Sequence, residues 1–216
     1  MGIRFIVKQT PPGPDYFLDN MDNGDNWVVF ETNDAGRFSG GRWEKYKANG
    51  VAQVDGSTLF QLEGEWEVII DFDIDSLVGT PTSAQYMQIY IDEPSEGKSK
   101  DSASFKLQGD SAGDLEWDVT IISNGSSQTA PPNWGPFNTG SYRLKVRKNV
   151  GSTITFWMWT GSQWEWDGDT NGYTTSGTSW GSNIGIRMNF YVTVESPSIL
   201  GGFDTVEQTA GTWSVV

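Results

Sequence analysis

The chain contains neither cysteine nor histidine among its 216 residues. Without cysteine it has no disulfide framework, and its redox compartment cannot be inferred. Without histidine it has no imidazole zinc ligand, no Ser-His-Asp triad and no histidine general base. No constellation of a metal-dependent lyase or hydrolase is therefore visible in the sequence.

Long apolar runs and positive charge are also scarce. No apolar run is long enough to span a bilayer, and the start M-G-I-R-F-I-V-K-Q-T lacks the apolar core of a secretory signal. The 28 acidic residues outnumber the 14 basic ones, so the net charge is −14. Because an acidic surface repels phosphate, we expect no nucleic-acid partner. Because no apolar run is long enough, we also expect no membrane insertion. The acids suit solubility or a hard cation such as calcium.

Helical periodicity is missing, whereas turn residues are frequent. The 26 glycines and 9 prolines separate short runs rich in β-branched and aromatic residues. This pattern predicts many short strands, as in an all-β sandwich or barrel. The P-P-G-P segment at 11–14 divides an N-terminal arm, 1–14, from a single domain over 15–216. The arm is either an edge strand of that domain or a segment docking onto a neighbouring chain, which would make a homo-oligomer.

The stretch from Thr153 to Asp167 contains four of the eleven tryptophans. Its apolar residues alternate with the others at a period of two, which predicts a strand, and Gly161-Ser162 supplies a hairpin turn. Counting pairs outward from that turn places four indoles on one face, those of Trp157, Trp159, Trp164 and Trp166. The opposite face then joins the core through Ile154, Phe156 and Met158. In this register Glu165 also lies on the core face, whereas shifting the strand pairing by one residue would turn Glu165 outward.

The indole face has two interpretations. It is either a platform for a glycan or a partner surface, or it is covered by the loops at 123–140 or 168–181. Sugar rings stack on flat aromatic rings while polar side chains bind their hydroxyls. Gln163 and Asn171 are the nearby polar candidates.

Two strands carry matching charge patterns. From Glu65 to Asp75, apolar residues alternate with acids, and from Ser141 to Lys148 they alternate with bases. Since like charges opposed across strands are destabilising, we expect the bases to lie on the same sheet face as the acids.

Several segments in order resemble concanavalin-A-like lectin/glucanase domains, close to the laminin-G-like branch. They are D-Y-F-L-D-N-M-D-N-G-D-N-W-V-V, S-G-G-R-W, G-E-W-E-V-I-I-D-F-D-I-D, S-Y-R-L-K-V-R-K-N-V-G-S-T-I-T-F-W and G-G-F-D-T-V. The resemblance implies a jelly-roll sandwich of two curved antiparallel sheets whose concave face often binds glycans. It also implies one structural calcium ion, held by Asp204 and by carbonyls near Asp19 and Gly41. The alternative is that Asp204 caps a turn without a metal.

The resemblance extends to glucanases, whose catalytic strand reads E-x-D-x-x-E or E-x-D-x-E. The nearest stretch here offers Glu67, Asp71, Asp73 and Asp75 on one face, but it lacks the glutamates of that motif. Facing arginines and lysines would keep these acids ionised, whereas a general acid needs a raised pKa. We therefore expect no catalytic residue and no enzyme activity.

These observations favour a non-catalytic lectin-like binding and assembly module. We expect a capsid-decorating or fibre protein of a virion surface, or otherwise an extracellular protein, with glycans or other virion proteins as partners. The lack of a secretory signal favours a virion, since phage particles leave the cell by lysis. The alternatives are an endoglycanase acting on a β-glucan and a carbohydrate-binding module of a secreted enzyme.

Overall fold

The computed structural model describes residues 18–22, 24–25, 27–31, 35–47, 51–56, 60–80, 82–92, 101–110, 112–128, 130–149, 153–175, 185–192 and 198–215. These residues form strands and turns, and within them no helix is long and apolar enough to cross a membrane. The predicted arm at 1–14 lies outside the described residues, so it stays a prediction.

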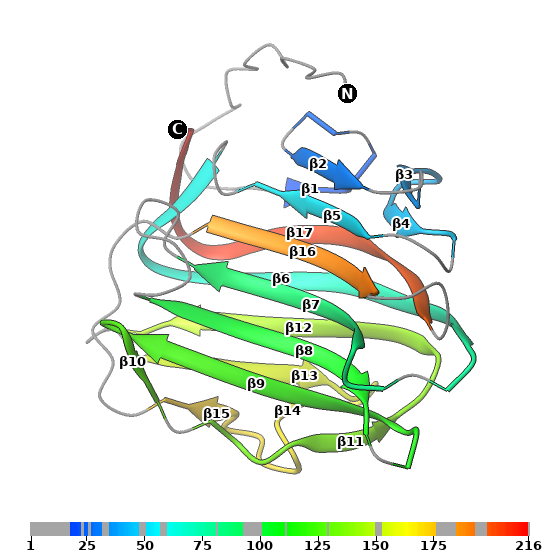
Figure 1. The fold of residues 1–216 in the computed structure, drawn as a ribbon. Helices are drawn as coiled ribbons and strands as arrows, with labels where there is room; N and C mark the ends of the chain where they lie inside the picture. Colours follow the sequence, from blue (N-terminus) through cyan, green and yellow to red (C-terminus); the bar gives the residue numbers. More distant parts are fainter. Residues whose placement is uncertain are drawn as a thin grey trace.

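The strands form two sheets stacked face to face (Figure 1). Sheet A has the order β14-β13-β12-β6-β17-β4-β3, with β1 beside β17 and β15 beside β13. Its strands are β1 (Leu18–Asp19), β3 (Gly36–Phe38), β4 (Trp43–Lys45), β6 (Phe60–Val78), β12 (Gly140–Lys148), β13 (Ile154–Trp159), β14 (Trp164–Glu165), β15 (Tyr173–Thr174) and β17 (Ser198–Val215).

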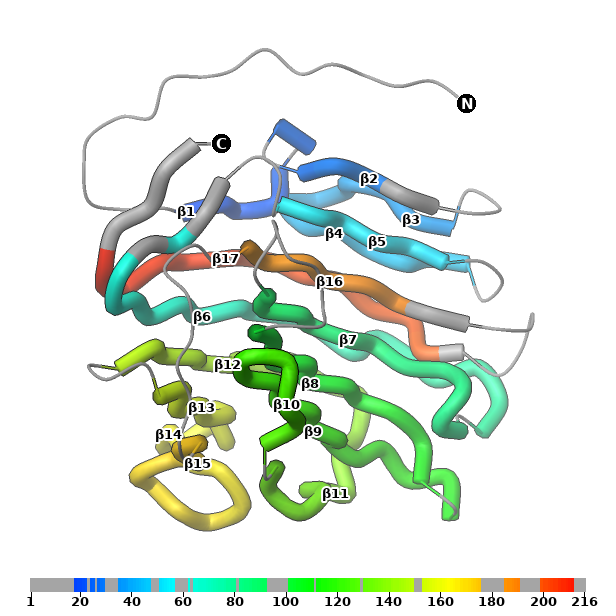
Figure 2. The backbone as a smooth tube through the Cα atoms, turned by 60° about the vertical axis from the view of Figure 1, so that its left-hand side comes forward, coloured from blue at the N-terminus to red at the C-terminus, as the bar shows by residue number. Residues whose placement is uncertain are grey.

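Sheet B has the order β10-β9-β8-β7-β16-β5-β2, with β11 beside β9. Its strands are β2 (Val28–Glu31), β5 (Ala52–Asp55), β7 (Gln85–Asp92), β8 (Ser102–Gly109), β9 (Leu115–Ser123), β10 (Ser126–Ser127), β11 (Trp134–Phe137) and β16 (Gly185–Val192). Figures 1 and 2 both place β11, β14 and β15 at one end of the sandwich, with β1 and β2 at the other. The strands named above pair antiparallel, so the predicted all-β sandwich is confirmed.

The core lies between the sheets and follows the predicted alternation. Along β6, every second residue from Trp66 to Ile74 is at most 1% exposed, because a strand points successive side chains to opposite faces. β12 and β13 contribute Leu144, Val146, Ile154 and Phe156 from the same sheet, and β7, β8 and β16 cover them from sheet B.

The outer face of β6 and β12 carries the charge pairing that the sequence predicted. Arg143 lies opposite Asp71 and Arg147 opposite Glu67, and both arginines form ion pairs with these acids. Lys145 lies opposite Ile69 instead of an acid. Asp73, on the same outer face of β6, pairs with Arg42 instead of a residue of β12, with 3.2 Å between the carboxylate oxygen and the guanidinium nitrogen.

Candidate functional site

The hairpin formed by β13 and β14 has the predicted register. Met158 lies opposite Glu165 and Trp159 opposite Trp164, with the turn at Gly161. Trp159 and Trp164 are half-buried on the outer side of sheet A, with ring centroids 5.5 Å apart. These two indoles therefore lie together as expected.

Trp166 corrects the prediction of a four-tryptophan face. It is 3% exposed and packs edge-on against Phe156, with ring centroids 4.7 Å apart. The cause is a second turn: the backbone N–H groups of Trp166 and Asp169 each donate to the other residue's carbonyl at 3.0 Å. Asp167 and Gly168 have φ of 49° and 85°, as in a type I′ turn. This turn ends the pairing with β13 after Glu165 and lets Trp166 enter the core.

Trp157 is on the outer side of sheet A, but it is covered and only 9% exposed. A Cβ added to Gly172 would lie 2.3 Å from the indole Nε1, so the backbone of the loop after β14 rests directly on this ring. The Lys145 ammonium lies 4.3 Å from the ring centroid on the neighbouring strand. The loop within 168–181 thus covers Trp157. Only Trp159 and Trp164 remain as an open platform.

The two polar candidates beside the hairpin bind within their own loops. Gln163 is exposed at the turn, where its Nε2 donates to Glu165. Asn171 donates its backbone N–H and its Nδ2 to Asp169 Oδ1, at 2.9 and 3.0 Å. Both side chains are thus engaged by neighbours in sequence.

A cavity of about 500 Å³ opens beside Trp159 at this end of sheet A. Aromatic and apolar side chains form much of its wall, and polar residues stand at its rim. The lining residues are Phe137, Ser141, Tyr142, Arg143, Met158, Trp159, Thr160 and Gly161.

Strand pairing brings the three residues predicted to hold calcium to the same stretch of β17: Asp19 pairs with Val206, and Gly41 lies two residues before Trp43, which pairs with Phe203. Asp19 lies opposite Val206 on the core side of β17, and its carboxylate accepts hydrogen bonds from Met21 N and Trp27 Nε1 at 2.7 and 2.8 Å. Asp204 lies at a register shift of β17. Burial, and then the negative charge of Asp73, raise its pKa to about 7, and Arg42 opposes them.

Gly41 lies in a tight turn with a φ of 81°, which Ser39 and Arg42 close by reciprocal backbone hydrogen bonds. Within the residues that the structure describes, no group of three or more Asp, Glu, His or Cys is arranged to hold a metal ion. The calcium implied by the resemblance would therefore be held by Asp204 and backbone carbonyls alone.

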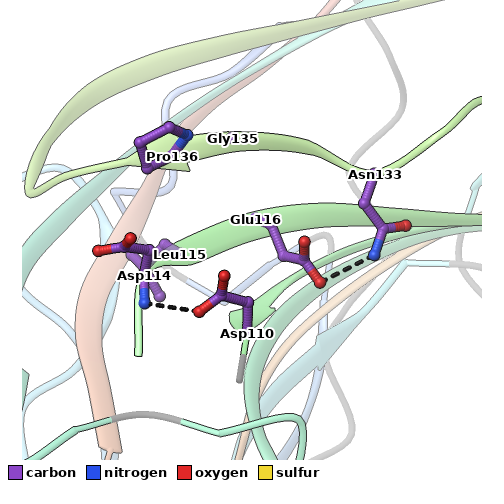
Figure 3. A pocket seen from close by; sticks show the side chains of 7 residues that line it. All are labelled: Asp110, Asp114, Leu115, Glu116, Asn133, Gly135 and Pro136. Atoms are coloured by element: carbon purple, nitrogen blue, oxygen red, sulfur yellow. Dashed lines mark hydrogen bonds between the residues drawn. The ribbon is translucent and has the colours of Figure 1, made fainter. Parts of the chain in front are cut away.

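A smaller cavity of about 200 Å³ lies at the edge of β9 and β11 (Figure 3). Two carboxylates that line this cavity accept hydrogen bonds from neighbouring residues. Asp110 Oδ1 accepts from the backbone of Ala112 and Asp114 at 2.8 and 2.9 Å, and Glu116 accepts from Asn133 at 2.8 Å. These hydrogen bonds shape a turn and tie β9 to the segment before β11.

The outer face of sheet B carries a polar surface that sequence patterning did not single out as a site. Asn189 of β16 lies opposite Gln88 of β7, and Gln88 lies opposite Lys106 of β8. Gln88, Gln108 and Asn189 are 5%, 7% and 7% exposed. Within the described part of the chain, Gln88 Oε1, Gln108 Oε1 and Asn189 Oδ1 are buried without a hydrogen-bond partner.

Two tyrosines flank these amides. Tyr86 lies opposite Gln108, with the Lys106 ammonium 4.5 Å from its ring centroid. Tyr90 lies opposite Ser104 and Arg187, with the Arg187 guanidinium 4.6 Å from its ring centroid. Alternation along a strand shows which of its residues share a face, but only the pairing of β7 with β16, a hundred residues apart, brings Gln88 and Asn189 together.

No known family model and no curated protein sequence matches the chain. Several solved structures match the chain in fold. Peanut lectin, in complex with a nine-residue peptide, is 11% identical, with a TM-score of 0.58 over 95% of this chain and 99% of that chain. The VIP36 exoplasmic/lumenal domain, bound to Ca²⁺ and Man3GlcNAc, is 13% identical, with a TM-score of 0.61 over 90% of each chain. The lectin from Bauhinia forficata, in complex with GalNAc, is 10% identical, with a TM-score of 0.58 over 94% of this chain and 99% of that chain.

At these identities the likeness establishes the fold. The chain has the concanavalin-A-like lectin jelly roll, as its sequence predicted. The three solved structures are legume-type or luminal lectin domains, and none of them is described as an enzyme. In keeping with this, Glu67 and Asp71 are engaged in structural contacts, each with an arginine and a threonine hydroxyl.

Proposed function

We propose that the chain is a non-catalytic carbohydrate-binding module whose glycan lies across the outer face of sheet B. The observation that carries this proposal is the set of buried amides at Gln88, Gln108 and Asn189, each with an unpartnered oxygen. The amide nitrogen of Gln88 binds Ser104, so whichever way this amide is turned, one of its ends lacks a partner.

An unpaired buried polar group costs about 1–3 kcal/mol. A glycan on this face would contact the exposed edges of these amide side chains, and the flanking rings of Tyr86 and Tyr90 would contact the apolar faces of the sugar. The lectin fold of the solved structures supports the same assignment. Such a surface recognises hydroxyl patterns and requires no catalytic group.

The test is a glycan array followed by titration of the best hit. We expect Gln88→Ala and Asn189→Ala each to weaken binding at least about tenfold, the loss typical of one or two hydrogen bonds. The matched control is Asn20→Ala, which removes an exposed amide next to β1, away from both proposed sites. No hit on the array, or a loss in the control equal to that in Gln88→Ala, would contradict the proposal.

A second proposal is a role in assembly, at the surface of a virus particle or in another extracellular setting. It is supported by exposed apolar side chains on β1 and the edge strand β2: Leu18, Val28 and Val29 are 45%, 49% and 42% exposed. An exposed edge strand is a template for pairing with another chain. The test is the solution mass of the chain and of Val29→Asp. An oligomer that dissociates in the variant supports assembly, and a monomer in both contradicts it.

A further inference from the structure

Arg143 lines the cavity beside Trp159, and its guanidinium is incompletely used. Its side chain is 42% exposed, and its Nε donates to Asp71 Oδ1 at 2.6 Å. Among the described residues its two terminal NH₂ groups donate no hydrogen bond. A guanidinium in this state can still bind a planar carboxylate through two parallel hydrogen bonds.

The guanidinium is held in place from two sides. Asp71 receives a second hydrogen bond, from the Thr205 hydroxyl at 2.8 Å, which fixes the carboxylate that Arg143 binds. The Arg143 guanidinium also lies 5.9 Å from the ring centroid of Trp164, which packs against Trp159. Trp164 therefore contacts both Arg143 and Trp159, which lie on the adjacent strands β12 and β13 on one face of the sheet.

We infer that this cavity binds a sugar residue that carries a carboxylate, such as a uronic acid unit of a polysaccharide. The inference rests on the proposed glycan-binding function and adds a second site, on the opposite sheet, with its own ligand class. The flat indole of Trp159 contacts the apolar face of the pyranose ring. The carboxylate binds the terminal nitrogens of Arg143, and the rim residues Ser141 and Thr160 offer hydroxyls to the sugar.

The local charge suits an anion despite the net charge of −14. Along β12, Arg143, Lys145 and Arg147 point to the outer face, whereas β6 sets only Asp71 and Glu67 opposite them. Lys145 faces Ile69, and its ammonium lies 4.3 and 4.6 Å from the ring centroids of Trp157 and Trp164. From Arg143 to Arg147, β12 therefore has one more cation than β6 has acids in direct register, and Asp73, opposite the lining residue Ser141, is paired with Arg42.

The test measures the affinity of the full chain, by calorimetry, for trimers of galacturonic, mannuronic and glucuronic acid. Each trimer is paired with its own methyl ester, which keeps the rings and removes the charge. We expect at least one acid to bind about tenfold or more tightly than its ester, the gain typical of a charge-assisted bidentate contact. Trp159→Ala should abolish the binding of both forms.

The decisive variant is the double change Arg143→Gln with Asp71→Asn, which leaves no unpaired charge behind. It should bring the acid-to-ester affinity ratio to about one while the melting temperature shows that the chain is folded. The matched control is Arg147→Gln with Glu67→Gln, which removes an equivalent ion pair of the same two strands outside the cavity. The control should keep the full ratio.

Equal affinities for acid and ester in all three series would overturn the inference, as would a control that lowers the ratio as much as the Arg143 variant. An acidic peptide that binds through Arg143 where all three trimers fail would also overturn it, in favour of a protein partner. The two proposals fail separately. If neutral glycans bind through Gln88 and uronates do not bind, the proposed function holds and only the uronate site is contradicted. If no glycan binds, both proposals are contradicted.

Discussion

Trp166 packs edge-on against Phe156 in the core, although its neighbour in the hairpin, Trp164, lies on the outer side of the same sheet. Trp134, from β11 of sheet B, approaches Trp166 with ring centroids 5.3 Å apart. The hairpin thus contributes one indole to stability and two to a surface.

This division predicts unequal effects of alanine substitution on the free energy of unfolding. Phe156→Ala and Trp166→Ala should each destabilise the fold by about 3–5 kcal/mol, because each empties a buried aromatic site. Trp159→Ala should cost about 1 kcal/mol or less, since its ring is half exposed. Urea denaturation followed by circular dichroism measures all three, and a cost for Trp159→Ala equal to that for Phe156→Ala would contradict the assignment.

The loop over Trp157 predicts a steric effect at Gly172. Gly172→Ala should destabilise the chain more than Gly161→Ala does, by about 1–3 kcal/mol, because the added methyl meets the Trp157 indole. Gly161 is the matched control, since its φ is also positive, at 92° against 73°, but its added methyl meets open space. Iodide quenching of indole fluorescence should rise only in Gly172→Ala. Equal destabilisation in the two variants would mean that backbone strain alone is responsible.

The ion pairs across β6 and β12 predict which charge changes are coupled. In a double-mutant cycle, Glu67 and Arg147 should show a coupling energy of about 0.2–1 kcal/mol, as is usual for pairs near the surface. Asp73 and Lys145 should be additive, because Asp73 binds Arg42 and lies opposite Ser141. Coupling between Asp73 and Lys145 larger than that between Glu67 and Arg147 would contradict the register.

The raised pKa of Asp204 predicts a pH-dependent cost to the fold. Burial raises this pKa to about 7 from an ordinary value of 3.8, so the folded chain holds this proton more tightly than the unfolded chain. The cost is absent below the ordinary value, grows as the pH rises, and is complete above about 7. Because the group is half-buried, Asp204→Asn should stabilise the chain by only about 1–2 kcal/mol at about pH 8 and by nothing at about pH 4. A gain that is equal at both values would show that charge is not the cause.

Calcium should leave the melting temperature close to that measured with a chelator, because the described residues offer no group of three or more acidic side chains, and a single carboxylate with backbone carbonyls holds calcium weakly. A ligand that binds only the folded state would add about 2.7 kcal/mol at a hundredfold excess over its Kd. If calcium raises the melting temperature by several degrees, and Asp204→Asn abolishes the increase, then Asp204 is a ligand after all.

Local patterns predicted much of the fold. The alternation in β6, β12 and β13 gave the correct core residues, and the turn at Gly161 gave the correct register of Trp159 with Trp164. Trp166 departs from the predicted face because Asp167-Gly168, a strong local hairpin signal, forms a second turn that ends the register set by Gly161. The surface at Gln88 and Asn189 could not be predicted in the same way, since it requires that β7 and β16 pair across a hundred residues.

The position of β17 has a consequence for how the chain is made. β17 is the last described strand, yet it lies inside sheet A, between β6 and β4, and pairs with β6 from Val215↔Phe60 to Ser198↔Val78. During synthesis, β4 and β6 emerge long before the strand that joins them, and they present unpaired edges in the meantime. High contact order of this kind slows folding. The nascent chain is therefore expected to stay open to misassembly until β17 leaves the ribosome.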